Sequence, residues 1–283
     1  MKRSYCKRWP LAFWLFWVML WPACSEAALS VVGTRFIYPS DGQPLSIHIA
    51  NRGDQPILVQ GWLDRGDMQV APSDIQVPFV LAPPLLRLDP REKHALQLRY
   101  TGEFLPADRE SLFWINLLEV SAQENRSGNR LHLNYRLRMK LLFRPQGLRG
   151  QPEAAVHQVI WRLLQAPAAG HSLRVEASNP SAFYVSLSSL ALEDAKRGIP
   201  LRATTLPPFA RTLFELPPDS GFPTSMRVHY QAVGDSGQLL EGSASLQAES
   251  GHPSAPLVRD VRVAMKDFLA CCRAPQMVCR VFL

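Results

Sequence analysis

The sequence predicts an all-β protein built from two β-sandwich domains. Short segments that alternate apolar and polar residues recur along the 283-residue chain, and turn-forming residues separate them. The period of apolar residues typical of helices is weak over the same region. Residues 146–152 (QGLRGQP) lose the alternation and are typical of a linker. These observations together indicate one sandwich on each side of that linker.

The first 27 residues are predicted to be an export signal. Basic residues precede an apolar stretch at 11–21, and small residues follow at a suitable cleavage position, so we expect the mature chain to begin at Ala28. The apolar stretch is well short of the roughly 20 residues that span a bilayer, which argues against a retained anchor and against stable membrane insertion. A lipoprotein signal ending at Cys24 is disfavoured by the bulky Trp21.

The charge of the chain is concentrated at its two ends. The formal net charge is +7, and removing the four basic and one acidic residues of 1–27 leaves +4. Residues 251–283 hold five basic and two acidic residues, so residues 28–250 carry only +1. A nearly neutral body gives no support for a nucleic-acid partner.

The cysteines leave the body of the chain without disulfides. All five lie outside residues 28–250: Cys6, Cys24, Cys271, Cys272 and Cys279. Three thiols within nine residues suggest a metal site, but their spacing lacks the paired C-x-x-C units of structural zinc sites. We therefore predict no metal and no cofactor. For residues 251–283 we expect an atypical basic tail, either extended or forming a short amphipathic helix.

The first domain is predicted to contain short strands separated by turns. Residues 46–49 and 57–62 alternate, and each run ends at a cluster of turn residues. The second cluster includes the triplet at 65–67 (RGD), which is also an adhesion motif, although the tip of a β-hairpin is the favoured interpretation. Pro83 and Pro84 indicate an edge strand or a bend.

The longest predicted strand covers residues 131–143. Because successive side chains of a strand point to opposite faces, one face is an apolar row and the other carries basic residues. The apolar row contains Leu131, Leu133, Tyr135, Leu137, Met139 and Leu141. A strand usually needs only about five or six residues, so this one offers more apolar edge than one sandwich requires. We expect another chain to pair with it.

The second domain shows the same pattern. Its predicted strands are at residues 173–177, 183–192, 211–216, 226–232 and 239–246. The predicted organisation is therefore a signal at 1–27, an N-terminal domain at 28–146, a linker at 147–153, a C-terminal domain at 154–250 and a tail at 251–283.

No convincing set of catalytic residues is present. The run at 234–237 (GDSG) resembles the surroundings of a protease nucleophile, but Asp-Ser-Gly between two β-segments is also common hairpin chemistry. Asp108 and Glu110 place two carboxylates close together, yet Arg109 between them favours a charged structural cluster. Phosphate-binding loops and H-E-x-x-H motifs are absent from the sequence. We predict that the protein is not an enzyme.

Five segments carry a resemblance to a known family. They occur in family order at residues 34–39 (TRFIYP), 82–88 (APPLLRL), 105–116 (LPADRESLFWIN), 140–145 (KLLFRP) and 179–185 (NPSAFYV). In these segments the chain resembles the periplasmic chaperones of the chaperone-usher pilus pathway. The resemblance implies two immunoglobulin-like domains in a boomerang arrangement with a cleft between them, in a protein of the periplasm.

The resemblance also implies a mode of action and its residues. Members of the family lend their long strand to a pilus subunit that lacks its final strand, and they deliver the subunit to an outer-membrane usher. On this sequence the donor strand is expected to use Leu131, Leu133, Tyr135, Leu137 and Met139. Arg35 and Lys140 are expected to anchor the terminal carboxylate of the subunit. Glu110, Arg144 and Asp235 match a charged cluster that fixes the angle between the family's domains. The alternative is a secreted two-domain adhesin or pilus structural component.

Overall fold

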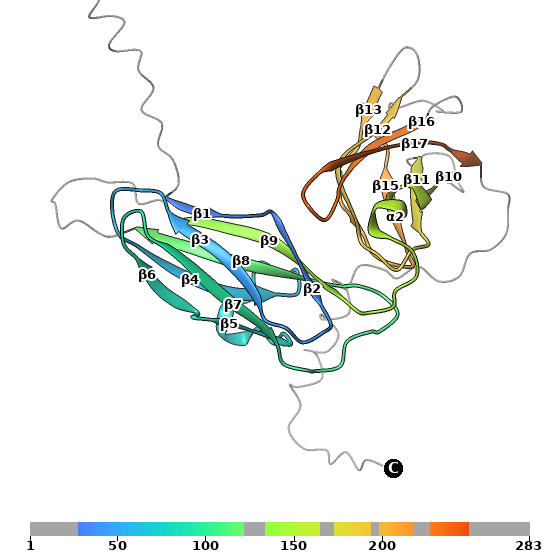
Figure 1. Ribbon diagram of the computed structural model, residues 1–283. Helices are drawn as coiled ribbons and strands as arrows, with labels where there is room; N and C mark the ends of the chain where they lie inside the picture. The colour runs from blue at the N-terminus through green and yellow to red at the C-terminus, as the bar shows by residue number, and fades with distance from the viewer. Residues whose placement is uncertain (1–27, 122–133, 165–172, 194–197, 218–226, 249–283) are drawn as a thin grey trace, which may run out of the picture.

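The protein folds into two separate β-sandwiches joined by a short connection (Figure 1). The computed structural model describes residues 28–121, 134–164, 173–193, 198–217 and 227–248. The prediction of an all-β chain with two sandwich domains is confirmed. The predicted export signal, the predicted tail and residues 131–133 of the long strand lie outside the described residues.

The first sandwich packs a four-stranded sheet against a five-stranded sheet. The four-stranded sheet has the order β1 (Leu29–Val31), β3 (Leu45–Asn51), β7 (Lys93–Tyr100), β5 (Phe79–Ala82). The five-stranded sheet has the order β2 (Arg35–Pro39), β9 (Tyr135–Arg144), β8 (Ser111–Ser121), β4 (Ile57–Asp64), β6 (Leu85–Leu88). Alternate residues of both sheets fill the core, including Ile47, Leu96, Ile115 and Leu141, all fully buried.

The long predicted strand is β9, and it has different neighbours on its two sides. On one side it pairs antiparallel with β8 from Tyr135 to Phe143. On the other side it pairs parallel with β2, but only from Lys140 onward, where Lys140 lies opposite Arg35. The first half of β9 therefore has a partner on one side only, within the described part of the chain.

The hairpin predicted at residues 65–67 is wrong, whereas the bend predicted at Pro83 and Pro84 is present. Residues 65–67 do not form the tip of a hairpin, because β4 pairs with β6 and β8, and the chain continues through a 3-10 turn, η1 (Pro72–Asp74), to the other sheet. Gly66 turns the chain there with a φ of 118°. Pro83 and Pro84 separate the edge strands β5 and β6 of opposite sheets, so the predicted bend is present.

The second sandwich has the same two-sheet construction. One sheet has the order β15 (Ala210–Glu215), β11 (Arg174–Asn179), β10 (Ile160–Leu164), β18 (Gln247–Ala248). The other has the order β13 (Gly198–Pro200), β12 (Val185–Glu193), β16 (Arg227–Val233), β17 (Leu239–Ser245), with β14 (Thr205–Leu206) also paired to β12. Trp161 lies between the sheets and packs on the rings of Phe214 and Tyr230.

A short helix that the sequence pattern did not predict enters the second sandwich. It is α2 (Pro152–Gln158), which has Pro152 in its first turn, where the missing amide hydrogen is not needed. Ala155 and Val156 are buried in the core, and the carbonyl of Val156 accepts a hydrogen bond of 2.8 Å from the Tyr230 hydroxyl. The helix thereby fixes the start of the second domain onto its core.

Candidate functional site

Two cations lie side by side where the first sandwich meets the second. Arg35 begins β2 and Lys140 lies in the middle of β9, and the parallel pairing of these strands places the two residues directly opposite each other. Both side chains reach toward the second domain. Arg35 donates to the carbonyl of Val233 at the end of β16, and Lys140 Nζ donates to the hydroxyls of Ser186 (2.9 Å) and Thr205 (2.5 Å).

The cation pair is held by neutral groups instead of carboxylates. Among the described residues, every ion pair involves residues other than Arg35 and Lys140. The Nε–H of Arg35 is buried and has no hydrogen-bond partner in the described structure. Because buried donors are normally satisfied, a cationic group with an unused donor indicates a position for an acceptor, preferably an anion.

The local electrostatics act against both charges. Burial and the neighbouring guanidinium of Arg35 lower the pKa of Lys140 from 10.5 to about 8. Burial also lowers the pKa of Arg35, although the carboxylates of Asp235 and Glu110 act in the opposite direction. An anion bound between the two cations would relieve this repulsion, so the arrangement is suited to a carboxylate.

The structure divides the predicted donor row of β9 into two parts. Met139 is buried in the core of the first sandwich, and Leu137 is partly buried against the same core. Tyr135 is 39% exposed and extends past that core. Leu131 and Leu133 lie outside the described residues. The structure thus uses Met139 within its own domain, and the apolar row becomes accessible toward its N-terminal end.

The exposed end of the row coincides with the open backbone edge of β9. Between Tyr135 and Met139 the side of β9 that faces away from β8 is unpaired in the described structure. This edge ends at Lys140, where β2 takes up the pairing. An unpaired strand edge of this kind is where an extended peptide adds as a further strand in other proteins, and here the edge ends at the cation pair.

Glu110, Arg144 and Asp235 come together at the junction of the domains. Arg144 Nε donates to Glu110 Oε1 (2.7 Å), and its two terminal nitrogens donate to the carboxylate of Asp235 (2.6 and 3.0 Å). The second oxygen of Glu110 accepts the amide hydrogen of Tyr184 in the second domain (2.8 Å). One guanidinium therefore joins a carboxylate of each sandwich.

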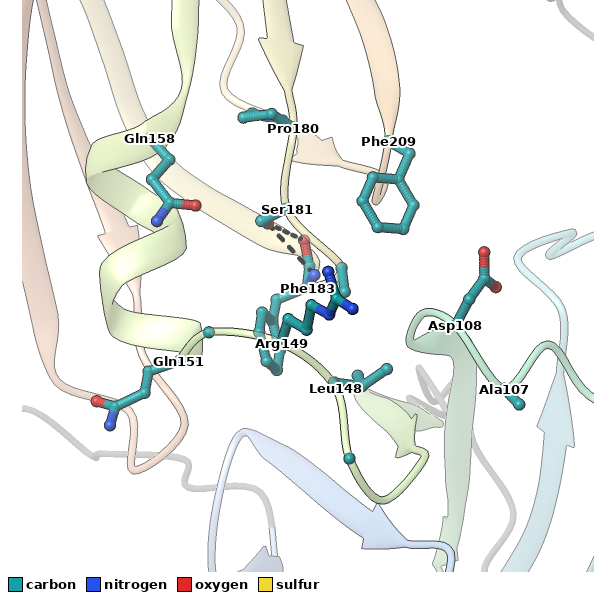
Figure 2. A pocket seen from close by; sticks show the side chains of 13 residues that line it. Ala107, Asp108, Leu148, Arg149, Gln151, Gln158, Pro180, Ser181, Phe183 and Phe209 are labelled. Carbon is teal, nitrogen blue, oxygen red and sulfur yellow. Dashed lines mark hydrogen bonds between the residues drawn. The ribbon is translucent and has the colours of Figure 1, made fainter.

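A recess of about 640 Å³ opens on the connection between the domains (Figure 2). Its lining includes Asp108 from the first domain, Arg149 from the connection, and Ser181 and Phe209 from the second domain. Asp108 is paired with Arg109 (2.7 Å), and the Ser181 hydroxyl donates to Asn179 Oδ1 (2.7 Å). These polar groups are thus already engaged with neighbours, and the recess presents no nucleophile aligned with a base.

The protease-like run at 234–237 forms the turn between β16 and β17. The amide of Gly237 donates to the carbonyl of Gly234 (3.0 Å), and the Ser236 hydroxyl donates to Gln238. Asp235 binds Arg144 and therefore does not orient a histidine, as a catalytic triad would require. Within the described residues, no group of three or more His, Cys, Asp or Glu side chains is placed to hold a metal ion.

Comparison with known proteins identifies the family. The N-terminal domain model of the PapD pili and flagellar-assembly chaperones matches residues 28–149, and the C-terminal domain model of the PapD pili-assembly chaperones matches residues 154–244. The chain belongs to the PapD family of pilus-assembly chaperones. The members of this family are chaperones, which are not a class of enzymes.

Individual relatives agree with this assignment. The probable fimbrial chaperone YadV of Escherichia coli K12 is 37% identical over 233 residues, which cover 81% of this chain and 94% of YadV. The chaperone MrkB of Klebsiella pneumoniae is 35% identical, with 64% of this chain and 77% of MrkB covered. These relatives are chaperones, so the alternative of an adhesin or structural pilus component is not favoured.

Solved structures of the family share the fold. The crystal structure of the YadV chaperone has a TM-score of 0.66 and 35% identity, covering 78% of this chain and all of that chain. The SafB chaperone in complex with the SafA pilin, from Salmonella enterica, has a TM-score of 0.63 and 26% identity, covering 79% and 99% of the two chains. The two sandwiches are therefore the immunoglobulin-like domains of this family. In the described residues, no helix is both long and apolar enough to cross a bilayer.

We predict that replacing Arg144 destabilises the protein far more than breaking an exposed ion pair. Arg144→Met leaves the carboxylate of Glu110, which is 2% exposed, without its cation, at an expected cost of about 3 to 5 kcal/mol in the free energy of unfolding. The matched control is Arg109→Met, which breaks the exposed pair with Asp108 and should cost at most about 1 kcal/mol. Urea unfolding of both variants measures the difference, and equal costs would contradict the structural role of the cluster.

We also predict a pH-dependent stability difference between wild type and Lys140→Met. Since the pKa of Lys140 is about 8 in the folded state and 10.5 is its ordinary value, the unfolded state binds more protons between these values. Wild type should therefore gain about 2 kcal/mol of unfolding free energy relative to the variant between pH 7 and about 9.5. Lys93→Met removes an exposed lysine and serves as control. If the difference in unfolding free energy between wild type and Lys140→Met does not change with pH, folding does not disfavour the charge of Lys140.

Proposed function

We propose that this chain is a periplasmic chaperone that binds pilus subunits by strand addition and delivers them to an outer-membrane usher. The family of the chain and the predicted export signal support the compartment and the role. The observation that carries the mechanism is the coincidence of an open strand edge with a buried cation pair at its end. We retain the division into an N-terminal domain at 28–146, a linker at 147–153 and a C-terminal domain at 154–250.

The subunit would add its last strand along the first half of β9. A strand whose terminal carboxylate lies between Arg35 and Lys140 must run in the same direction as β9 and end where β2 begins. The apolar row beside it, formed by Leu131, Leu133, Tyr135 and Leu137, would fill the gap in the core of the subunit. We leave Met139, which the family resemblance also implies as a donor residue, out of this proposed row, because its side chain already packs in the core of the first domain.

The two parts of this site contribute differently. Four apolar side chains at about 1.5 to 3 kcal/mol each exceed, in gross terms, two charge-assisted hydrogen bonds of about the same size. Affinity should therefore come mainly from the apolar row, together with the backbone hydrogen bonds of the added strand. The carboxylate contacts set the register, since a shift by one residue would turn every side chain to the other face.

The charged cluster would keep the two parts of the site in alignment. Arg35 and Lys140 belong to the first domain, whereas the groups that hold them, Ser186, Thr205 and Val233, belong to the second. We propose that Glu110, Arg144 and Asp235 fix the angle between the domains and thereby the position of both cations.

The carboxylate anchor is tested by subunit retention. Lys140→Met or Arg35→Ala should give folded chaperones that no longer co-purify with co-expressed pilus subunits, because the subunit terminus loses a charge-assisted partner. Lys140→Arg keeps the positive charge and is the matched control, for which we expect most of the binding to remain. Normal retention by both Lys140→Met and Arg35→Ala would contradict the anchor.

The strand edge is tested at its exposed apolar residue. Tyr135→Glu places a charge on the row that would enter the subunit core, and it should reduce subunit retention at least about tenfold. Val80→Glu changes a residue of similar exposure on the opposite sheet and is the control. If both variants retain subunits equally, the row is not the binding surface.

A further inference from the structure

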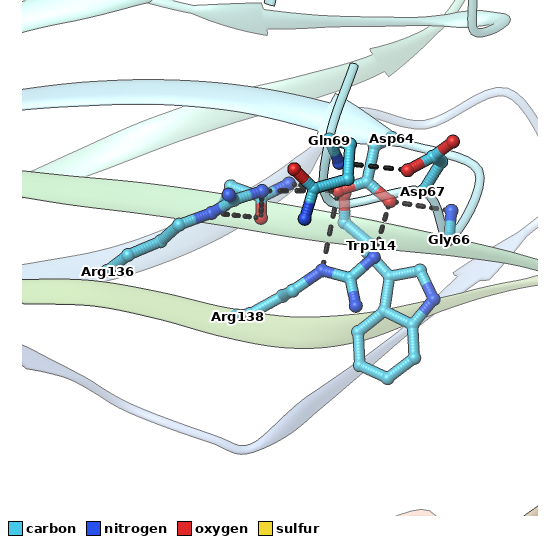
Figure 3. Close-up of polar contacts among 8 residues, drawn as sticks. Asp64, Gly66, Asp67, Gln69, Trp114, Arg136 and Arg138 are labelled. Carbon is cyan, nitrogen blue, oxygen red and sulfur yellow. Dashed lines mark hydrogen bonds and ion pairs between the residues drawn. The ribbon is translucent and has the colours of Figure 1, made fainter. Parts of the chain in front are cut away.

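The open edge of β9 carries two arginines that ought to obstruct it. Arg136 and Arg138 point to the face opposite Tyr135 and Leu137, in the same stretch that lacks a strand partner. Long cationic side chains on edge strands are a common device against pairing with another chain. In this protein, however, both guanidinium groups are turned away from the edge and lie over the sheet (Figure 3).

Arg138 is held by the two strands on the inner side of β9. Its Nη2 donates to Asp64 Oδ1 (2.7 Å) and its Nε lies 3.4 Å from Asp64 Oδ2. The guanidinium carbon lies 4.2 Å from the ring centroid of Trp114. Asp64 belongs to β4 and Trp114 to β8, so every one of these contacts draws Arg138 away from the open side.

Arg136 is held in the same direction by a neutral acceptor. Its Nε and Nη2 donate to Asn116 Oδ1 (3.0 and 2.8 Å), and its guanidinium carbon lies 4.8 Å from the ring centroid of Trp62. Asn116 in turn donates from Nδ2 to Asp64 Oδ2 (2.8 Å). Arg136 Nη2 also lies 3.7 Å from Asp64 Oδ2. Asp64 therefore supports Arg138 directly, and it supports Arg136 both directly and through Asn116.

Asp64 is itself firmly placed. It is 1% exposed, and its Oδ1 also accepts the amide hydrogen of Gly66 (2.6 Å). Burial alone would raise the pKa of Asp64, but the hydrogen bonds from Arg138, Asn116 and Gly66 outweigh it and keep that pKa below its usual value. The carboxylate is thus ionised at neutral pH and serves as a fixed counter-ion for the retracted arginines.

We infer that Asp64 is a positioning residue that keeps the β9 edge open to a client strand by holding Arg136 and Arg138 over the sheet. This inference rests on the proposed function. Neighbouring strands are about 4.8 Å apart, a distance that an arginine side chain exceeds, so a released Arg138 is long enough to cover the place of the incoming strand. Its donors would also compete for the backbone carbonyls that the client strand needs.

A double-mutant cycle tests this inference. The probe is a synthetic peptide of about ten residues, alternating valine and threonine, with a free terminal carboxylate, and its dissociation constant is measured by fluorescence anisotropy. Asp64→Asn keeps the size of the side chain but removes its charge, and it should raise the dissociation constant about tenfold. Adding Arg138→Met to Asp64→Asn should restore binding to within about twofold of wild type, because the released Arg138 is gone and Arg136 is still held by Asn116. Asp108→Asn, which breaks an exposed aspartate–arginine pair outside β4, β8 and β9, should leave binding unchanged.

The outcomes separate this inference from the proposed function. Wild-type affinity in a folded Asp64→Asn variant, or no recovery in the double variant, would overturn the positioning role. Equal binding of the free peptide and its C-terminal amide would refute the carboxylate anchor but not the role of Asp64. If neither peptide binds wild type, the edge does not accept strands and both proposals fail. Should Asp64→Asn not fold, Asn116→Ala removes both hydrogen bonds that hold Arg136 and leaves it only the 3.7 Å ion pair with Asp64. This variant should weaken peptide binding, and adding Arg136→Gln is expected to restore it.

Discussion

The structure depends on a single constraint, which is that β9 has a full-length partner on one side and a half-length partner on the other. Its pairing with β8 and the burial of Leu141 and Phe143 anchor it firmly in the first sandwich. Its pairing with β2 begins only at Lys140. The same strand is therefore a core element along its second half and an available edge along its first, and both candidate parts of the site follow from this change.

Two of the three cations Arg35, Lys140 and Arg144 at the junction of the domains have no carboxylate partner in the described structure. Arg35 and Lys140 repel each other and are partly desolvated, whereas Arg144 nearby is neutralised by two carboxylates. Arg144 joins one carboxylate from each domain, whereas Arg35 and Lys140 remain without a carboxylate partner in the described structure. Unpaired cations of this kind are typical of binding sites, where the folded protein is less stable than it would be with two neutral residues in their place.

The sequence pattern predicted the strands well and their partners poorly. Alternation identifies a half-buried strand such as β9, but it does not distinguish Met139, which serves the core of its own domain, from Tyr135, which extends beyond it. The helix α2 was missed because a stretch of seven residues is too short to show the helical period of apolar residues. The prediction of a hairpin at 65–67 was wrong because β4 pairs with β6 and β8, which lie further along the chain, and local turn residues do not reveal that pairing. The contact of Arg35 with Lys140 was expected only from the family resemblance, since periodicity carries no information on parallel pairing.

The collinearity of β2 with the open edge has a consequence for the choice of client. The place beyond Lys140 is already filled by β2, so a guest strand has no path on which to continue past the cation pair. If a client strand adds to this edge as proposed, the edge would accept the end of a chain and exclude an internal segment, whatever its composition. Under the proposed function, the chaperone selects a subunit whose final strand ends in a free carboxylate, and a subunit whose chain continues past that strand is rejected before its side chains are compared.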